Sequence, residues 1–198
     1  MDVIQQIKAI DTDLFIFLNS KHNAFFDVLM YWASHKFFWI PLYLFFLYLV
    51  YKQIGKRVWT VLIAVVLLII LSDQLSVHLF KNVFMRLRPC HEPLLQSSIH
   101  LLNNHCGGSF GFVSSHAANT FALASFLILF FENKTRYFTF FLIAWACFVS
   151  YSRVYSGVHY PGDVIVGGVL GGGIGIVVYK WYVFFMNKCS KDTFSKQN

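Results

Sequence analysis

Long apolar runs separated by short polar segments dominate the chain from residue 35 onward. Because a helix needs about 20 apolar residues to cross a hydrocarbon core of roughly 30 Å, runs of about 15–23 residues indicate bilayer-crossing helices. The pattern predicts five of them: His35–Tyr51, Val58–Leu79, Ala117–Phe131, Tyr137–Ser152 and Val164–Phe185. The predicted fold is therefore an all-α, polytopic membrane helical bundle with five transmembrane helices, and six is the alternative count.

The first 34 residues have a different pattern. Apolar residues recur there at near-helical spacing among Asp and Lys: Ile4, Ile7, Ile10, Leu14, Phe17 and Leu18. This is typical of an amphipathic helix that lies in the membrane interface, which Phe25–Trp32 either continues or leaves by dipping into the bilayer. We predict three parts: an amphipathic N-terminal segment 1–34, a transmembrane domain 35–187 that carries the chemistry, and a cytoplasmic tail 188–198.

The last apolar run is rich in glycine: Gly167, Gly168, Gly171, Gly172, Gly173 and Gly175. Glycines four residues apart lie on one side of a helix and let a neighbouring helix approach closely in lipid. A phosphate-cradling loop would instead need a following Lys-Ser or Lys-Thr and a position outside the span. Helix packing is therefore the favoured interpretation.

The composition agrees with a membrane protein, since 57% of the residues are apolar, 19% are aromatic and only 13% are charged. The net charge of +7 comes from Lys and Arg scattered at the ends of the apolar runs, which argues against nucleic-acid binding. The positive-inside rule assigns one set of loops to the cytoplasm because of these residues: Lys52, Lys56, Arg57, Lys134, Arg136, Lys180, Lys188, Lys191 and Lys196. No cleavable signal peptide is expected from the first twenty residues. A multi-pass protein of the bacterial inner membrane is expected, with the opposite loops on the periplasmic side.

Three polar clusters lie where these runs begin or end, at residues 81–89, 114–116 and 152–163. Ionisable groups are costly in a membrane, so their clustering indicates function. If the second span continues far enough, Lys81 and Arg88 are nearly two helical turns apart and point to one side. The second cluster begins the third span, where free backbone N–H groups and the helix dipole favour an anion.

The third cluster contains a histidine and a carboxylate at helical spacing. Pro161 suits the first turn of the last span, which places His159 just before the helix and Asp163 in its opening turn. The carboxylate can accept the ring N–H, fix the tautomer and leave the other nitrogen free to attack. Together the clusters suit the oxyanion of phosphoryl transfer. No carboxylate cluster suited to Mg²⁺ accompanies them, so we expect a site without metal or cofactor, in which Lys and Arg replace the metal.

These elements resemble the signature of the type 2 phosphatidic acid phosphatase superfamily, which reads K-x6-R-P, then P-S-G-H, then S-R-x5-H-x3-D. The first and third elements are matched in full by Lys81, Arg88, Pro89, Ser152, Arg153, His159 and Asp163. The middle element appears as Val113-Ser114-Ser115-His116, so its Ser and His match while its Pro and Gly do not. The resemblance covers about residues 58–185, and three ordered elements make chance agreement very small.

The resemblance implies a membrane phosphatase that works through a phosphohistidine. His159 would be the nucleophile, and Asp163 would orient it. His116 would protonate the leaving group and then activate water. The phosphate would be bound by the other motif residues: Lys81, Arg88, Arg153, Ser114 and Ser115.

Two cysteines, Cys90 and Cys106, lie in the long polar loop. If this loop faces an oxidising periplasm, they can form a disulfide, which would stabilise the fold by about 3 kcal/mol. Free thiols are one alternative. A zinc site with His91 and His105 is another, although adjacent Cys-His pairs lack the usual spacer for tetrahedral ligation.

The sequence thus predicts a lipid phosphatase whose partners are a lipid phosphate and the surrounding membrane lipids. Candidate substrates are undecaprenyl diphosphate, lipid A phosphate, phosphatidylglycerol phosphate and phosphatidic acid. The motif residues recognise only the phosphate, so the choice stays open at this point, as does the oligomeric state. A lipid phosphotransferase with the same histidine chemistry is the alternative enzyme, and a non-enzymatic lipid-binding protein is the alternative class.

Overall fold

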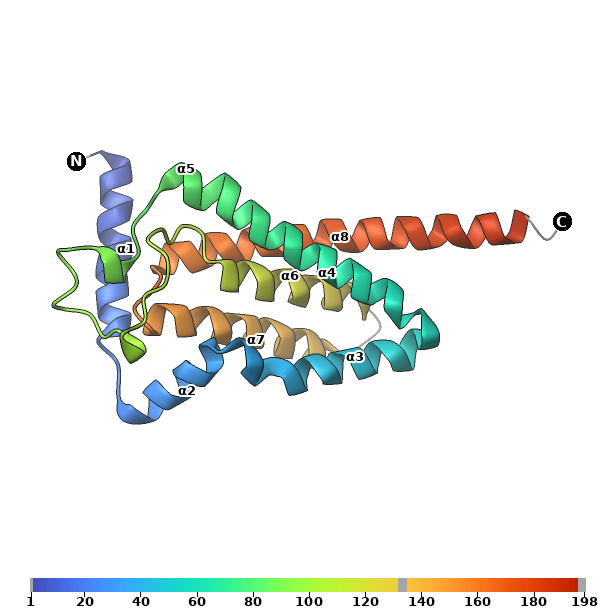
Figure 1. The fold of residues 1–198 in the computed structure, drawn as a ribbon, viewed down its shortest axis with the longest axis horizontal. Helices are drawn as coiled ribbons and strands as arrows, with labels where there is room; N and C mark the ends of the chain where they lie inside the picture. Colours follow the sequence, from blue (N-terminus) through green and yellow to red (C-terminus); the bar gives the residue numbers. More distant parts are fainter. Residues whose placement is uncertain (1, 132–134, 196–198) are drawn as a thin grey trace.

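The computed structural model describes residues 2–131 and 135–195, with side chains described as far as Cys189. All of the regular elements in these ranges are helices. Five of them form a bundle along the long axis of the molecule (Figure 1): α3 (Ile40–Ile54), α4 (Val58–Leu75), α6 (Ser115–Phe130), α7 (Arg136–Tyr155) and α8 (Pro161–Ser195). The all-helical bundle predicted from the apolar runs is therefore confirmed.

Three helical segments of the described chain are long and apolar enough to cross a membrane: Lys36–Phe84, Arg136–Tyr155 and Pro161–Cys189. The first is 49 residues long. It contains α3 and α4, which run in opposite directions from a turn at Gly55, where φ is +58° (Figure 1). The helix α6 is also apolar but has only 16 residues. Large apolar side chains on the outside of these helices are exposed, as contact with lipid requires: Ile63, Val66, Phe140 and Val169.

The helices α6 and α8 pack through a line of glycines, here called the glycine seam: Gly167, Gly171 and Gly175. A Cβ built on Gly171 would overlap the carbonyl of Ala118, and one on Gly167 would lie 2.7 Å from Ser114 O. No larger residue fits at this separation, so the seam does what glycines at four-residue spacing do in membrane helices. Because α6 and α8 both begin at the same end of the bundle, the seam fixes those two helix starts relative to each other.

Two further helices, α1 (Val3–Asn19) and α2 (Ala24–Ser34), precede the bundle. The helix α1 lies across the end of the bundle rather than along it (Figure 1). Its outer face exposes apolar side chains such as Ile4, while Phe15 is fully buried and makes an edge contact with Tyr160. The N-terminal segment is thus two helices, the first crossing the bundle end and the second packing against α7.

The long polar loop after α5 (Asn82–Phe84) covers the same end of the bundle (Figure 1). It is mostly irregular, with short 3-10 turns at Pro89–His91 and Leu102–Asn104. A disulfide joins Cys90 to Cys106, whose Cα atoms are 5.9 Å apart. The loop is therefore closed on itself above the ends of α6, α7 and α8.

A hydrogen-bonded cluster ties this loop to the N-terminal helices. Asn19 Nδ2 donates to His100 O at 3.0 Å and to Tyr155 O at 2.9 Å, and Asn19 Oδ1 accepts from His100 N at 2.7 Å. Asp27 Oδ1 accepts from Tyr155 Oη at 2.6 Å and lies 2.8 Å from His100 Nε2. Burial alone would raise the pKa of Asp27, but the bonds from Tyr155 and His100 and the His100 charge lower it overall.

Candidate active site

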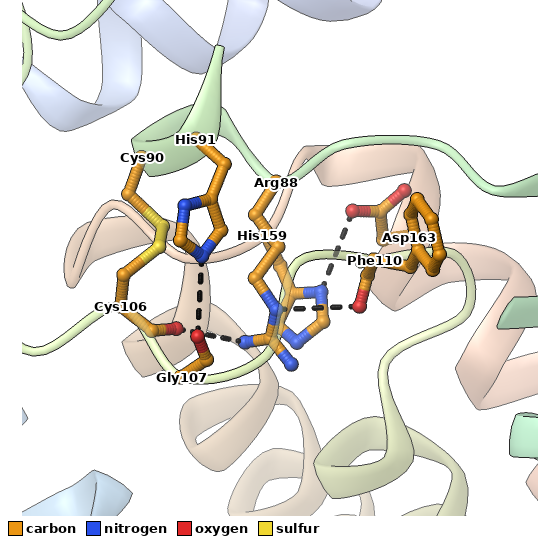
Figure 2. Close-up of a disulfide and its surroundings, with 8 residues drawn as sticks. All are labelled: Arg88, Cys90, His91, Cys106, Gly107, Phe110, His159 and Asp163. Atoms are coloured by element: carbon orange, nitrogen blue, oxygen red, sulfur yellow. Dashed lines mark hydrogen bonds and ion pairs between the residues drawn. A yellow bond between two sulfur atoms is a disulfide. The ribbon is translucent and has the colours of Figure 1, made fainter.

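His159 and Asp163 lie at the junction of α7 and α8. The chain turns at Gly157, where φ is +78°, and Pro161 then begins α8, so Asp163 falls in the first helical turn as predicted. Asp163 Oδ2 accepts a hydrogen bond from Tyr160 N at 3.0 Å and lies 3.4 Å from His159 Nδ1 (Figure 2). Both side chains are buried, and this contact leaves Nε2 as the other ring nitrogen.

The surroundings of His159 favour the neutral form of its imidazole. Burial and the charges of Arg88, Arg153 and Lys81 hold the pKa of His159 well below its ordinary value, against the opposing effect of a hydrogen bond to the Gly111 backbone. A neutral imidazole with one nitrogen directed at a carboxylate is the nucleophilic form. The three cations come from the first and third sequence motifs, so those motifs converge on His159.

Arg88 is positioned by the polar loop, and the predicted common helix face with Lys81 is wrong. The helix that carries Lys81 ends before Met85, whose φ of +43° is left-handed. Arg88 instead donates from Nε to Phe110 O and from Nη1 to Cys106 O, both at 3.3 Å (Figure 2). Two carbonyl groups of the loop therefore hold the Arg88 guanidinium at the site, and one of them belongs to the disulfide-bonded Cys106.

Lys81 lies at the end of a π-helical segment, Ser76–Lys81, that continues α4. Such segments are rare in proteins and often occur at functional sites. Lys81 Nζ donates to Ser115 Oγ at 2.7 Å, and Ser76 Oγ lies 2.7 Å from the same hydroxyl. Ser115 stands where the family signature has glycine, so in this chain the departure supplies a hydroxyl that holds the ammonium group.

The start of α6 carries the middle motif. Ser114 is the N-cap residue, and its backbone N donates to Asp163 O at 3.0 Å, which joins the middle motif to the third. His116 follows in the first turn, within electrostatic reach of Arg153 and His159. Arg153 Nε is buried and has no hydrogen-bond partner among the described residues. A buried guanidinium nitrogen of this kind is suited to an anionic oxygen.

An apolar cavity of about 740 Å³ extends from His116 into the bundle between α3, α4, α6 and α7. Most of its lining is apolar, with Trp39, Phe46 and Leu123 among the residues, while Asp73 adds a carboxylate. His116 therefore lies where the polar site meets this apolar cavity.

Sequence reasoning missed three residues that contact this site: Arg86, Asp11 and Gly111. Arg86 forms ion pairs with Asp163 and with Asp11. A Cβ built on Gly111 would lie 3.0 Å from Asp163 Oδ2 and 3.5 Å from His159 Nδ1. Arg86 and Gly111 lie close to the motifs in the sequence, and this proximity could have identified them as candidate site residues. Asp11 lies in the helix that was predicted to lie in the membrane interface, and nothing in the sequence connects this residue with the motifs.

The chain belongs to the PAP2 superfamily, whose family model matches residues 62–187. The predicted family resemblance is thereby confirmed. Among its relatives is a lipid A 4'-phosphatase of Bacteroides thetaiotaomicron, 37% identical over 179 residues that cover 89% of this chain and 79% of that protein. A lipid A 4'-phosphatase of Porphyromonas gingivalis is 34% identical over 182 residues, covering 91% and 76%. An undecaprenyl-diphosphatase of Sulfolobus acidocaldarius is 31% identical over 170 residues, covering 84% and 76%.

Two solved structures share the fold. LpxE of Aquifex aeolicus matches with a TM-score of 0.62 at 24% identity, over 85% of this chain and 94% of that one. A PAP2-type phosphatidylglycerolphosphate phosphatase of Bacillus subtilis matches with a TM-score of 0.67 at 20% identity, over 92% and 87%. At these identities the likeness concerns the fold alone.

Proposed function

We propose that this protein is a lipid A 4'-phosphatase that works through a phosphohistidine on His159. The observation that carries the phosphatase chemistry is the convergence of Lys81, Arg88 and Arg153 on a buried, neutral imidazole backed by Asp163. Three cations around one nucleophile can neutralise phosphoryl oxygens, which is the main requirement of phosphoryl transfer. The choice of lipid A is supported by two relatives of that activity at 37% and 34% identity.

In the first step, His159 Nε2 attacks phosphorus, and the bond from phosphorus to the lipid oxygen breaks as the N–P bond forms. Asp163 faces Nδ1 and stabilises the positive charge that develops on the ring. The three cations bind the phosphoryl oxygens. His116 gives a proton to the departing lipid oxygen, so the lipid leaves as a neutral alcohol.

In the second step, His116 accepts a proton from a water molecule as that water attacks the phosphorus atom. The N–P bond breaks, its electrons return to His159, and inorganic phosphate leaves with the new P–O bond. The backbone N–H groups at the start of α6, beside Ser115, favour the negative charge in both steps. Donors of this kind, cations and amides, hold an anion, so we propose chemistry without a metal ion.

The apolar cavity beside His116 supports a lipid as the leaving group. A cavity of about 740 Å³ with a mainly apolar lining can hold part of an acyl chain. The phosphate would then lie among the cations, and the tail would lie between α3, α4, α6 and α7. His116, at the junction of the two regions, would be next to the oxygen that it protonates.

We further propose five membrane crossings, made by α3, α4, α6, α7 and α8, with the site on the periplasmic side of the inner membrane. The segment Lys36–Phe84 supports this count because it folds back at Gly55 and so supplies two crossings. The basic loops at the other end support the orientation. Lys134 and Lys196 lie outside the described residues, as does the side chain of Lys191.

This topology assigns a place to each predicted part of the chain. Residues 1–34 would lie in the outer interface over the catalytic end, and residues 35–187 would form the transmembrane phosphatase domain. Residues 188–198 would be the cytoplasmic tail. The family model, which matches residues 62–187, supports the end of the middle part.

The test is a phosphate-release assay on the purified protein in detergent. Lipid A with both phosphates would be compared with undecaprenyl diphosphate, phosphatidylglycerol phosphate and phosphatidic acid. We expect the highest kcat/KM for lipid A, with phosphorus NMR showing loss of the 4'-phosphate and retention of the 1-phosphate. His159→Asn, close in shape but not nucleophilic, should abolish release. A preference for another lipid would overturn the substrate assignment, and turnover by H159N would overturn the mechanism.

The same assay separates the alternatives. Release of inorganic phosphate without any acceptor lipid supports a hydrolase, whereas transfer that requires an acceptor would support the phosphotransferase. Activity should persist in EDTA and be blocked by vanadate, which mimics five-coordinate phosphorus. Loss of activity on chelation would contradict the proposed metal-independent chemistry.

A further inference from the structure

Arg86 lies within the first motif, but its side chain forms ion pairs with two carboxylates. Nη1 donates to Asp163 Oδ1 at 3.0 Å, and Nη2 lies 2.7 Å from Asp11 Oδ2. The guanidinium also lies over the Tyr160 ring, with Cζ 3.8 Å from the centroid. Both terminal nitrogens and one face are therefore occupied, which separates Arg86 from the arginines that converge on the nucleophile.

Asp11 connects this ion pair to the start of α8. Its Oδ1 accepts a hydrogen bond from Gly162 N at 2.7 Å, while its Oδ2 pairs with Arg86. A carboxylate at a helix N-terminus is favoured by the free amides and by the helix dipole. A Cβ on Gly162 would lie only 2.8 Å from Asp11 Oδ2, so glycine makes room for this contact. Asp11 thus fixes both Arg86 and the first turn of α8.

The network reaches the nucleophile through Asp163. One oxygen, Oδ1, receives Arg86, and the other, Oδ2, receives Tyr160 N and faces His159 Nδ1. Without the Arg86 bond, the carboxylate would still accept from Tyr160 N, but a single bond holds its plane less firmly, so Oδ2 would be less well directed toward the imidazole. Partners that orient a ligand or base in this way are often as important as the group they hold. Arg86 O also accepts a bond from Gly111 N at 2.9 Å.

We propose that Arg86 and Asp11 are positioning residues, which hold Asp163 so that His159 Nε2 is aligned with phosphorus. In this arrangement α1 completes the active site by supplying Asp11 across the end of the bundle. The proposal rests on the phosphohistidine chemistry proposed above. It assigns the N-terminal helix a part in the rate of the reaction, in addition to its contact with the membrane interface.

Chemical rescue of Arg86→Ala tests the proposal directly. We expect kcat to fall by about 100-fold, as for a misplacement of about 1 Å, with little change in KM. An open groove of about 650 Å³ borders Arg86 and Tyr160, so a small cation can reach the space left by the side chain. Guanidinium at low, non-denaturing concentration should restore kcat, whereas urea, similar in shape but neutral, should not. Wild-type kcat in R86A, or equal rescue by both compounds, would overturn the proposal.

Two inhibitors separate alignment from phosphate binding. Inorganic phosphate occupies the cationic site as a tetrahedral ion, whereas vanadate can expand to five-coordination by accepting the imidazole nitrogen. R86A should therefore weaken vanadate binding and leave phosphate binding unchanged. Equal weakening of both would assign Arg86 to phosphate binding or to general folding and refute a positioning role. Both affinities can be measured by titration without turnover, so this test stands even if no lipid in the panel is hydrolysed.

Asp11→Asn provides the second variant, with Asp13→Asn as its control. The amide oxygen of D11N can still accept from Gly162 N, but the charge that holds Arg86 is gone. We expect D11N to lower kcat with little change in KM. Asp13, exposed on the same helix, should be replaceable without effect. If R86A does not fold, as judged by thermal unfolding, R86K is the variant to measure. Its lysine keeps a positive charge beside the carboxylates but not both of the guanidinium bonds, so kcat should be intermediate. Wild-type kcat in D11N, or an equal loss in D13N, would rule out the part assigned to α1.

Discussion

Gly111 provides a sharp test of how closely the side chains of the candidate active site are packed. Its backbone φ is not in the positive range, so alanine is compatible with the conformation and only the space for a methyl group is in question. The new Cβ would lie 3.0 Å from Asp163 Oδ2 and 3.2 Å from Arg88 Cγ. Carbon atoms prefer separations of about 3.5–4.0 Å, so the arginine must retreat by about 0.3–0.8 Å.

The expected loss of activity follows from that displacement. Since a misplacement of about 1 Å can cost about 100-fold in rate, Gly111→Ala should lower kcat/KM by about 5–50-fold. The KM should rise as well, because Arg88 is one of the cations around His159. The folding of the variant should be nearly unchanged, since the methyl group enters the site and not the helical core.

The assay is phosphate release in detergent micelles, with thermal unfolding measured in parallel. Gly108→Ala is the matched control, because it lies in the same loop and a Cβ there would meet nothing within 4 Å. Wild-type kcat/KM in G111A would show that the site can accept a methyl group without displacing Arg88, and would refute the reasoning. An equal loss in G108A would assign the effect to the loop as a whole.

Three further predictions concern the loop and the helix start. Reducing the disulfide between Cys90 and Cys106, or replacing both with serine, should raise KM because the Cys106 carbonyl holds Arg88, which is proposed to bind the phosphate. Unchanged kinetics in reducing buffer would contradict this. Ser115→Gly introduces the residue of the family signature and removes the hydroxyl bonded to Lys81, which is proposed to bind the phosphate, so KM should rise while kcat stays close to wild type. The pKa of Asp27 is lowered in the folded protein, so its stabilising effect is full at neutral pH and is lost as the pH falls below the ordinary carboxyl value near 3.8. Hydrogen exchange of the loop should therefore increase in acid for the wild type, and already at neutral pH for Asp27→Asn, whose bond from Tyr155 is weaker.

The bundle could be predicted because apolar length is a strong signal in a membrane protein. The three middle runs agree with the helices to within a few residues, and Pro161 begins α8 as its chemistry suggests. The last run was predicted to end at Phe185, but α8 continues to Ser195 and so includes most of the predicted tail. The glycine spacing also predicted that the last span packs closely against another helix, and the structure identifies that helix as α6. The first 34 residues were harder, because an amphipathic pattern does not show that the chain breaks between α1 and α2. Periodicity reports the faces of a helix and not its direction relative to other helices.

The site could be predicted only as far as local spacing reaches. His159 and Asp163 are separated by one helical turn, so their contact follows from the sequence. The position of Arg88 does not follow from the sequence, because the helix ends before Met85 and the side chain is then held by a backbone carbonyl of the loop. The contact of Asp11 with Gly162 spans 151 residues. Such a contact depends on the packing of the whole bundle, and no pattern along one sequence encodes it.

The glycine seam makes catalytic alignment a question of helix register. Slippage of α8 by a single residue would turn it by about 100° and shift it by about 1.5 Å, which would swing Asp163 away from the start of α6. Bilayers differ in thickness, and the protein has to adapt to these differences at a part of the structure away from the seam. The opposite end of α8 projects beyond its neighbours (Figure 1) and is free of that constraint. Length can therefore be added or lost at that end over evolution while the reacting atoms stay in place.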